Sequence, residues 1–229
     1  MQNCPISGMA LFVDWTENAQ SILNDIDARP WMGSGNKSLP NPELRRKTQQ
    51  YSSCNALFLF KTRCFVEYSA HSHSEDNFIP SVIMNKVVQP LMEIQHVDKL
   101  CGSMFSLSNL HLLINEYMPG QGIMPHTDSS LVFGEWVAIL SLSADCIMKF
   151  TQNEDNEVRS AEKEIEFYLP KNSLLILSGE ARHNYKHSIS KDLDENGYDY
   201  INCKKVRVHR ERRVSLTFRT VLQFPLLDQ

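Results

Sequence analysis

The second half of the chain consists of short apolar segments separated by turns, and this pattern limits the fold more than any other feature. The segments have the length of β-strands, and no run with a helical period stands between them. Strands joined without crossover helices pair in antiparallel sheets, and a series this long closes into a double-sheet jelly roll. The expected strands are residues 110–117, 136–142, 145–150, 163–169, 173–178, 185–189, 206–210 and 213–222.

Two stretches of the N-terminal part carry helical patterns instead. The first, residues 16–27, follows a cap at Thr16 or Asp14, and its buried side is formed by Ile22, Leu23 and Ile26. The sequence therefore predicts an α+β fold that is mainly β, with a double-stranded β-helix (jelly-roll) core and flanking N-terminal helices.

The second helix opens at Pro80 and runs to about His96. We expect a kink at Pro90, because proline has no backbone N–H to donate within a helix. Apolar residues at helical spacing form its buried stripe: Ile79, Ile83, Val87, Leu91 and Ile94. Around the two helices we expect an apolar entry segment at residues 8–13, a turn-rich loop at 29–44 and a strand or hairpin at 56–68.

Size and composition place the chain among globular proteins. Its 229 residues fit one β-rich domain, and 42% of them are apolar against 22% charged. We expect a single domain, residues 1–229, in which residues 1–100 form a lid and supporting helices and residues 101–229 form the jelly-roll catalytic core.

Charge and cysteine content limit the compartment and the partners. A formal net charge of -4 argues against a protein that binds nucleic acid by an overall positive charge, but it leaves room for a local basic groove. The six cysteines are scattered without a C-x-x-C pair, which indicates reduced thiols and an intracellular location, in the nucleus, the cytoplasm or both. No secretory signal and no apolar run of membrane-spanning length stand out.

The segment from Asn115 to Asp128 carries the first candidate for chemistry. It reads as a strand and a Pro-Gly turn that delivers His126 and Asp128 onto one face, because residues two apart in a strand point the same way. An imidazole and a carboxylate placed so are two of the three ligands in a 2-His-1-carboxylate Fe(II) site, which leaves positions open for a cosubstrate and O₂. The H-x-D pattern alone is weak evidence, since similar pairs occur at His73, His96 and His209.

A third ligand has to come from further along the chain. The downstream candidates are His183, His187 and His209. His187 is favoured because it lies in an expected strand, with Tyr185 and Ile189 on its face. His183, in the turn before that strand, stays the alternative.

Two arginines follow on the last expected strand. Arg213, Ser215, Thr217 and Arg219 share one face, opposite Val214, Leu216 and Phe218. Guanidinium groups beside an iron site suit a dicarboxylate cosubstrate, since each forms a bidentate, permanently charged clamp on a carboxylate. The alternative is a basic edge strand that faces water.

Basic residues elsewhere suggest contacts to a substrate. Arg45, Arg46 and Tyr51 could form a lip that contacts phosphate and stacks on a base, or a solvated strand edge. The basic run from Lys204 to Arg213 could line a groove that follows a phosphate backbone, or blunt the edge of a sheet.

Taken together, these motifs resemble the signature of AlkB-type Fe(II)/2-oxoglutarate-dependent dioxygenases, and most of all the AlkB-like domain of tRNA wobble-uridine hydroxylases. The resemblance covers residues 110–222, and the later Ser-Gly-Glu-Ala-Arg run at 178–182 adds to it. It implies that His126, Asp128 and His187 hold iron. It also implies that Arg213, helped by Tyr117, anchors the distal carboxylate of 2-oxoglutarate, with Arg219 and Asn115 near the chelating end. Ser215 stands where many members of the family have Asn.

The resemblance also implies a reaction. Fe(II), 2-oxoglutarate and O₂ would hydroxylate a C–H bond and release succinate and CO₂, and an N-methyl group treated so is lost as formaldehyde. The favoured partner is nucleic acid, with a modified base in tRNA or other RNA ahead of alkylated DNA. Two alternatives remain: the same chemistry on a protein such as a histone with methylated lysine, and a binding module without iron.

Overall fold

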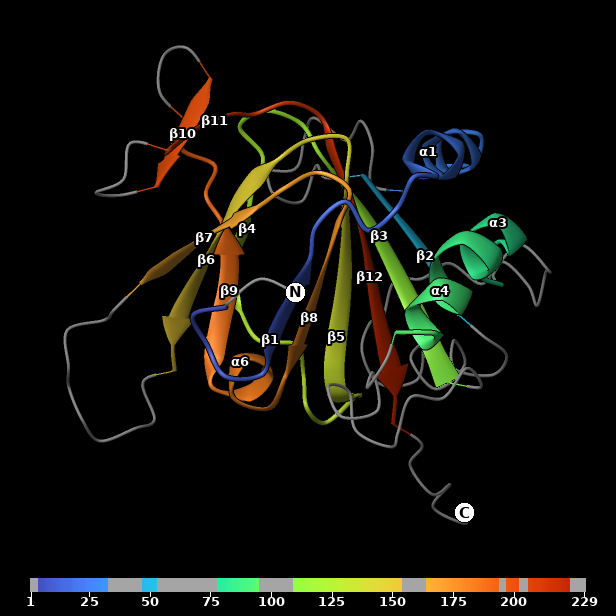
Figure 1. The fold of residues 1–229 in the computed structure, drawn as a ribbon, viewed down its shortest axis with the longest axis horizontal. Coiled ribbons are helices and arrows are strands. Elements are labelled where there is room, and N and C mark those ends of the chain that lie inside the picture. The colour runs from blue at the N-terminus through green and yellow to red at the C-terminus, as the bar shows by residue number, and fades with distance from the viewer. Residues whose placement is uncertain are drawn as a thin grey trace.

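A computed structural model describes residues 4–32, 47–52, 78–94, 109–153, 164–193, 197–201 and 206–222. In this part of the chain the strands form two antiparallel sheets that pack face to face (Figure 1). The larger sheet has the order β1 (Met9–Phe12), β8 (Ser173–Ser178), β5 (Phe133–Leu142), β12 (Arg213–Val221), β3 (Leu110–Tyr117) and β2 (Lys47–Ser52). The smaller has the order β4 (Ile123–His126), β9 (Tyr185–Ile189), β6 (Cys146–Gln152) and β7 (Ile165–Leu169). The predicted jelly roll is confirmed.

A separate ribbon of β10 (Tyr198–Ile201) and β11 (Val206–His209) lies beyond the smaller sheet. Tyr198 pairs with His209 and Asp199 with Val208, so the chain returns to strand structure after the described residues that follow β9.

The alternation of side chains on β12 explains why the larger sheet has apolar surfaces on both sides. Val214, Leu216 and Phe218 are fully buried in the core between this sheet and the helices. The intervening residues of β12 face the other sheet. A second core cluster, which includes Val137 and Ile139 of β5, fills the space between the sheets. A period of two thus assigns each strand residue to one of two interiors.

The helices cover the outer face of the larger sheet (Figure 1). α1 spans Ala19–Asp27 and buries Ile22, Leu23 and Ile26 as predicted. The predicted cap was wrong, because Asn18 occupies the N-cap position. The backbone N–H of Asn18 donates a hydrogen bond to the Thr16 hydroxyl at 3.1 Å. The helix therefore begins later than residue 16.

The second predicted helix is divided into three parts. α3 (Ser81–Ile83) leads into a π-helical turn, η3 (Met84–Val88), and then into α4 (Gln89–Met92). Pro90 lies in the first turn of α4, where a missing N–H costs least, and the wider π turn before it removes the clash expected in a regular helix. Ile83, Val87 and Leu91 are fully buried, as predicted.

The N-terminal part contributes strands as well as helices. β1 pairs with β8, and β2 pairs with β3 as an edge of the larger sheet. The chain after β8 also differs from the predicted turn, because it forms a short helix, α6 (Gly179–His183), before β9. Gly179 has a φ of +48°, a conformation that a glycine adopts at little cost.

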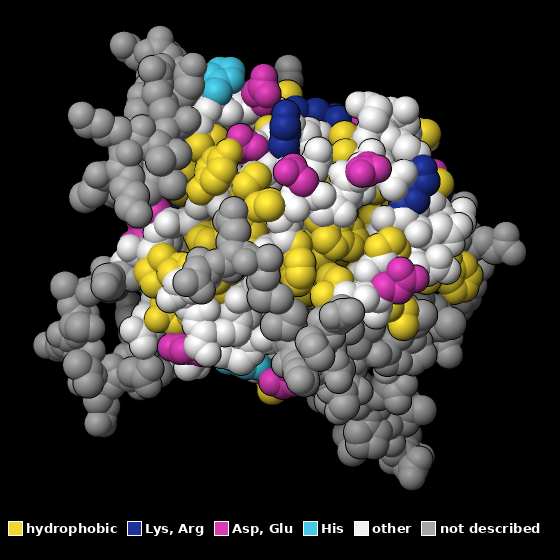
Figure 2. Space-filling model, in the orientation of Figure 1, with side chains coloured by type: hydrophobic (Ala, Val, Ile, Leu, Met, Phe, Trp, Pro, Cys, Tyr) yellow, Lys and Arg dark blue, Asp and Glu magenta, His cyan; other side chains and the backbone are white. Residues whose placement is uncertain are grey.

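Several features noted in the sequence lie outside the described residues: the strand or hairpin at 56–68 and the pairs at His73 and His96. Among the described residues, no helix is both long enough and apolar enough to span a membrane. On the face shown in Figure 2, the Lys and Arg side chains of the described residues stand in small groups near the edge, with acidic side chains between them.

Candidate active site

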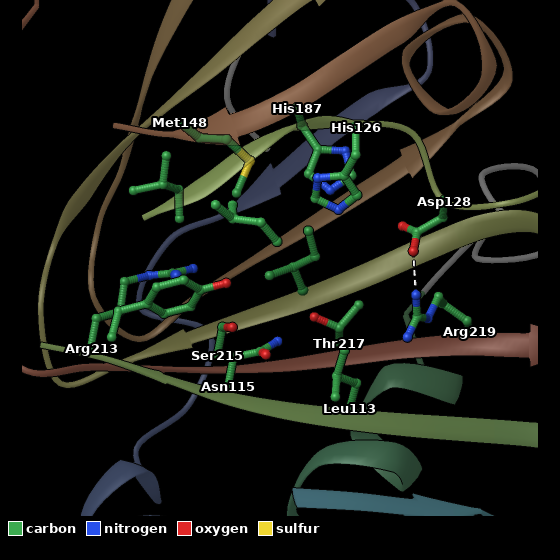
Figure 3. Close-up of a pocket in the computed structure, with 14 residues that line it drawn as sticks. Leu113, Asn115, His126, Asp128, Met148, His187, Arg213, Ser215, Thr217 and Arg219 are labelled. Atoms are coloured by element: carbon green, nitrogen blue, oxygen red, sulfur yellow. Dashed lines mark hydrogen bonds and ion pairs between the residues drawn. The ribbon is translucent and has the colours of Figure 1, made fainter. Parts of the chain in front are cut away.

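A pocket with an empty volume of about 440 Å³ lies between the two sheets (Figure 3). Its wall includes every residue for which the sequence predicted a role in metal or cosubstrate binding. The lining consists of Leu113, Asn115, Tyr117, Ile123, His126, Asp128, Ile139, Met148, His187, Ile189, Arg213, Ser215, Thr217 and Arg219.

A β-bulge turns His126 into the pocket. Ile123 pairs with Ile189 and His126 pairs with His187, so three residues of β4 span the distance that two residues of β9 cover. Ile123 and His126 therefore face the pocket together despite their odd spacing. Gly122 permits the close approach of the two strands, since a Cβ there would lie 2.2 Å from the main-chain oxygen of Ile189.

The two pocket histidines stand opposite one another. Their ring centroids are 4.4 Å apart. The Nδ1 of His126 lies 2.8 Å from the main-chain oxygen of Met124. Because a carbonyl oxygen only accepts, Nδ1 carries the proton in this contact, and Nε2 is left as the basic nitrogen of the neutral ring.

His187 is buried and kept neutral by its surroundings. Burial lowers its pKa to about 4, and the neighbouring His126 adds to the effect. A neutral imidazole keeps a lone pair for a metal ion. The alternative candidate, His183, lies at the end of α6 with its Nε2 2.9 Å from Oε2 of Glu135, and it does not line the pocket.

Asp128 is the acidic group of the pocket. β4 ends at His126, so Asp128 belongs to the following loop and not, as predicted, to the same strand face. Its carboxylate is ion-paired with Arg219 of β12. Burial raises the pKa of Asp128, but Arg219 and the two nearby histidines outweigh it and lower the pKa below its ordinary value. Asp128 is thus an anion at neutral pH.

The two imidazoles and the carboxylate form a donor set of the kind that Fe(II) takes. Within the described part of the chain, however, no three His, Cys, Asp or Glu side chains converge closely enough to hold a metal ion. In Figure 3 the carboxylate of Asp128 points toward Arg219, while His126 and His187 stand together beside it. The donor types fit iron, and convergence requires Asp128 to turn from Arg219.

The other end of the pocket is built around Arg213. Its side chain is 2% exposed, and its Nε donates to the Ser141 hydroxyl at 2.8 Å. Its guanidinium carbon lies 5.3 Å from the centre of the Tyr117 ring. Within the part of the chain that the structure describes, neither Nη2 of Arg213 nor the side-chain oxygen of the adjacent Asn115 has a hydrogen-bond partner. A buried cation with an unmet donor calls for an anion from outside the chain.

A row of five polar side chains crosses the larger sheet at this level, and the sequence predicted a role for only two of them, Ser215 and Asn115. Neighbouring strands pair these residues one to the next, so all of them point to the pocket side. The row consists of Ser173, Ser141, Ser215, Asn115 and Thr48. They come from five different strands, and only the register brings them together.

The middle of the pocket is apolar and was also missed. Ile123, Ile139, Met148 and Ile189 line it between the two polar ends. Alternation along β5 and β6 would have marked Ile139 and Met148 as inward-facing, but not as neighbours of the histidines.

The predicted substrate residues do not gather at the pocket. Arg45 and Arg46 lie outside the described residues. Tyr51 is 6% exposed, belongs to the core beneath the helices, and donates its hydroxyl to Gln49 at 3.0 Å. Tyr51 pairs with Leu112, and both side chains face away from the pocket. The prediction that the Tyr51 ring stacks on a base is therefore wrong.

Two arginines of the basic run before β12 bind to other groups of this chain. Arg210 is 3% exposed and donates to the main-chain oxygens of Ser190 and Gln121 at 3.1 and 2.9 Å. Arg212 forms ion pairs with Glu116 at 2.7 Å and Asp27 at 2.5 Å. These two arginines join loops and elements of this chain, which is a structural role.

Comparison of the sequence with known proteins finds a family model and several relatives. The model described as "2OG-Fe(II) oxygenase superfamily" matches residues 16–219. An uncharacterized protein, L905, of Acanthamoeba polyphaga mimivirus is 36% identical over 220 residues, which cover 95% of this chain and 87% of that protein. The "Alkylated DNA repair protein ALKBH8 homolog" of Arabidopsis thaliana is 29% identical over 234 residues, or 96% of this chain and 60% of that protein.

A shorter match is to the "tRNA (carboxymethyluridine(34)-5-O)-methyltransferase alkbh8" of Xenopus tropicalis, 40% identical over 79 residues. It covers 34% of this chain and 12% of that protein. The chain thus spans three fifths of the Arabidopsis relative and a small part of the Xenopus relative.

Solved structures support the fold. "The structure of OsALKBH1" matches with a TM-score of 0.58 at 15% identity and covers 95% of this chain and 100% of that chain. A Pseudomonas putida prolyl-4-hydroxylase matches with a TM-score of 0.51 at 12% identity, over 94% of this chain and 93% of that chain. At these identities the likeness concerns the fold alone.

Proposed function

The chain belongs to the 2OG-Fe(II) oxygenase superfamily and is AlkB-like, so we propose that its pocket binds Fe(II) through His126, Asp128 and His187 and 2-oxoglutarate through Arg213. We propose further that the enzyme hydroxylates or oxidatively demethylates a modified base in nucleic acid, with RNA, and tRNA in particular, ahead of alkylated DNA.

The observation that carries the proposal is the unmet donor of Arg213. A guanidinium that is 2% exposed and has a free Nη2 is costly to keep unless a ligand pairs with it. The neighbouring Tyr117, Asn115 and Ser215 surround that end with further polar atoms. A carboxylate bound there would form the charge-assisted, bidentate contact that arginine geometry favours.

The length of the pocket supports a ligand with two polar ends. Apolar side chains separate the Arg213 end from the histidines, which suits the methylene groups of 2-oxoglutarate. Arg219 lies at the Asp128 end of the pocket (Figure 3), where it is available to the end of the cosubstrate that lies near the metal, whereas Asn115 stands beside Ser215 at the Arg213 end. When bound, Fe(II) and 2-oxoglutarate supply the oxidation of a C–H bond by O₂, with release of succinate and CO₂.

The residues of this chain prepare that chemistry. His126 keeps its proton on Nδ1, next to the main-chain oxygen of Met124, and so presents Nε2 to a metal. His187 stays neutral because it is buried. Asp128 stays ionised because cationic side chains surround it. The apolar walls exclude water from the space between the two polar ends.

The substrate class is supported by the names of relatives. The Arabidopsis relative is named as an alkylated DNA repair protein, and the Xenopus relative as a tRNA methyltransferase. A base in a polynucleotide must leave its stack to enter a pocket between two sheets. The match covers 12% of the Xenopus protein, so the methyltransferase activity in its name is no part of this proposal.

The test measures succinate formed from 2-oxoglutarate by the purified protein with Fe(II), with His126→Ala as the blank. Bulk tRNA, methylated single-stranded DNA and core histones are added separately. We expect tRNA to stimulate turnover in the wild type and not in the variant. Stimulation by histones alone would replace the nucleic-acid proposal with a protein substrate. Equal, background turnover in both proteins would leave a binding module without iron.

A further inference from the structure

Arg182 is a buried arginine beside the proposed metal site that has no part in the chemistry above. It belongs to α6, its side chain is 3% exposed, and it does not line the pocket. Its Nη1 donates to the main-chain oxygen of Asp128 at 2.7 Å. Arg182 therefore contacts Asp128 through the main chain and from outside the pocket.

The helix that carries Arg182 is fixed by contacts at both of its ends. The backbone N–H of Ala181 donates to the main-chain oxygen of Ser7 at 3.0 Å, so the N-terminal segment holds one side. The side-chain amide of Asn153 donates to the main-chain oxygen of His183 at 2.8 Å, so the end of β6 holds the other. Arg182 is thus a rigid point of attachment for the loop that contains Asp128.

Asp128 is held by two guanidinium groups that come from different parts of the fold. Arg219 of the larger sheet pairs with its carboxylate, and Arg182 holds its main-chain carbonyl. If the carboxylate leaves Arg219 to face the two imidazoles, the contact of Arg182 with the main-chain oxygen of Asp128 remains and holds the backbone in place. The Asp128 side chain can then rotate about χ1 and χ2 while the main chain of Asp128 stays in place.

Stability alone does not explain an arginine at this position. Its Nε and Nη2 are buried without a hydrogen-bond partner. Two unmet donors on a buried cation raise the free energy of the folded state, and an apolar residue would avoid that cost. Yet, among the described residues, the hydrogen bond that the Arg182 side chain does make is to Asp128, the acidic residue beside His126 and His187.

We propose that Arg182 is a positioning residue for metal binding, which acts through the main-chain carbonyl of Asp128 and keeps that carboxylate within reach of His126 and His187. This inference rests on the proposed function, because it takes Asp128 as a metal ligand. Groups that orient metal ligands commonly contribute 10-fold to 100-fold, as an order of magnitude, to metal affinity.

The test is a titration of the metal-free protein with Co(II), followed by visible absorption, in the wild type, Arg182→Gln and Arg182→Lys. We expect the Kd for Co(II) to rise about 10- to 100-fold in Arg182→Gln. Arg182→Lys should recover part of the loss, since an ammonium group can donate to the same carbonyl. The KM for 2-oxoglutarate at saturating Fe(II) should stay within about threefold of the wild-type value, because the Arg213 end is unchanged.

Glu135→Ala is the matched control. It removes the 2.9 Å contact between Glu135 and His183 at the end of the same helix and does not touch Asp128. We expect wild-type Co(II) binding in this variant. If it weakens Co(II) binding as much as Arg182→Gln does, docking of the helix is the cause and the proposal fails.

Thermal unfolding shows whether each variant is folded, and Arg182→Lys carries the test if Arg182→Gln is not. A folded Arg182 variant that retains wild-type affinity for Co(II) would overturn the inference. Asp128→Ala separates this failure from that of the proposed function. If Asp128→Ala binds Co(II) as the wild type does, the metal site itself is wrong. If only Asp128→Ala loses Co(II), the site stands and Arg182 has no part in it.

Discussion

The two buried arginines of β12 lie on one face of one strand, at opposite ends of one pocket, and differ in their partners. Arg219 is ion-paired with Asp128, and its guanidinium carbon lies 4.0 Å from the centre of the Phe133 ring. Arg213 contacts the neutral hydroxyl of Ser141, and its Nη2 has no partner. Asp128 is the one acidic side chain among the described residues that line the pocket, and it pairs with Arg219, not with Arg213.

In the metal-free protein this difference separates a charge that is paired within the chain from a charge that awaits a ligand. At the Arg219 end the protein supplies its own carboxylate, so in this state the pair stabilises the fold. At the Arg213 end the opposite charge has to arrive with a ligand. Removal of a charged group should therefore lower stability at the first end and ligand affinity at the second.

The largest expected effect on stability is that of Asp128→Ala, which leaves the buried Arg219 without its counter-charge. Breaking a buried ion pair on one side commonly costs about 3–5 kcal/mol. Urea unfolding of the metal-free protein at pH 7 measures the loss. The double variant Asp128→Ala/Arg219→Met should recover part of it, because no unpaired charge remains. A loss below about 1 kcal/mol in the single variant would show that the pair is solvated and that the two ends are alike.

Arg213→Met tests the other end. We expect the KM for 2-oxoglutarate to rise on the order of 100-fold, since removal of one partner of a buried charge contact commonly costs about 2–5 kcal/mol. Urea unfolding without ligand should show no loss of stability, because the side chain that is removed had an unmet donor. If unfolding shifts as much as in Asp128→Ala and the KM does not change, Arg213 is a structural residue like Arg219.

Low pH should reduce the stability of the folded protein through groups at the Arg219 end of the pocket and not through groups at the Arg213 end. Burial lowers the pKa of His187 to about 4 and that of His111, next to Arg219, to about 3. As the pH falls below 6.5, the ordinary pKa of histidine, these two imidazoles become protonated in the unfolded chain but stay neutral in the folded protein. The stability present above pH 6.5 is therefore lost as pH falls toward the folded values, by about 2 kcal/mol for each imidazole at pH 5.

Urea unfolding of the metal-free protein at pH 7 and pH 5 checks this expectation. His111→Gln removes one of the two imidazoles and should reduce the difference between the two pH values by about half. An unchanged difference in that variant would assign the acid sensitivity to other groups.

Local periodicity was enough to predict most strands in the second half of the chain and the faces of β12, but not β1, β2 or β10. The alternation along β12 placed Arg213, Ser215, Thr217 and Arg219 on one side, and the structure brings all of them to the pocket. Elements whose apolar residues repeat at a fixed spacing were likewise predicted, including the buried stripes of both N-terminal helices. These features depend on a residue and its near neighbours in the chain.

Features that depend on pairing between distant strands were not predicted. The bulge that turns His126 inward exists only against β9, and a lone strand gives no sign of it. Tyr51 was placed at a substrate lip because the basic residues before it suggest a surface, whereas its partner Leu112 puts it in the core. Ser141 could not be chosen from the sequence, because only the register brings its hydroxyl to Arg213.

Ser141→Ala is the smallest change that still addresses the comparison, because it alters Arg213 without touching its charge. The Ser141 hydroxyl accepts from Nε at 2.8 Å and fixes the plane in which Nη2 faces the pocket. Its loss should raise the KM for 2-oxoglutarate about tenfold and leave kcat unchanged, since a hydrogen bond to a charged group is worth about 1.5–3 kcal/mol. Ser173→Ala is the control: it lies next in the same row, is equally buried, and bonds the main-chain oxygen of Pro170 instead. If both variants raise the KM alike, the polar row acts as a whole, and the orientation of Arg213 is not the reason that this end of the pocket binds a ligand.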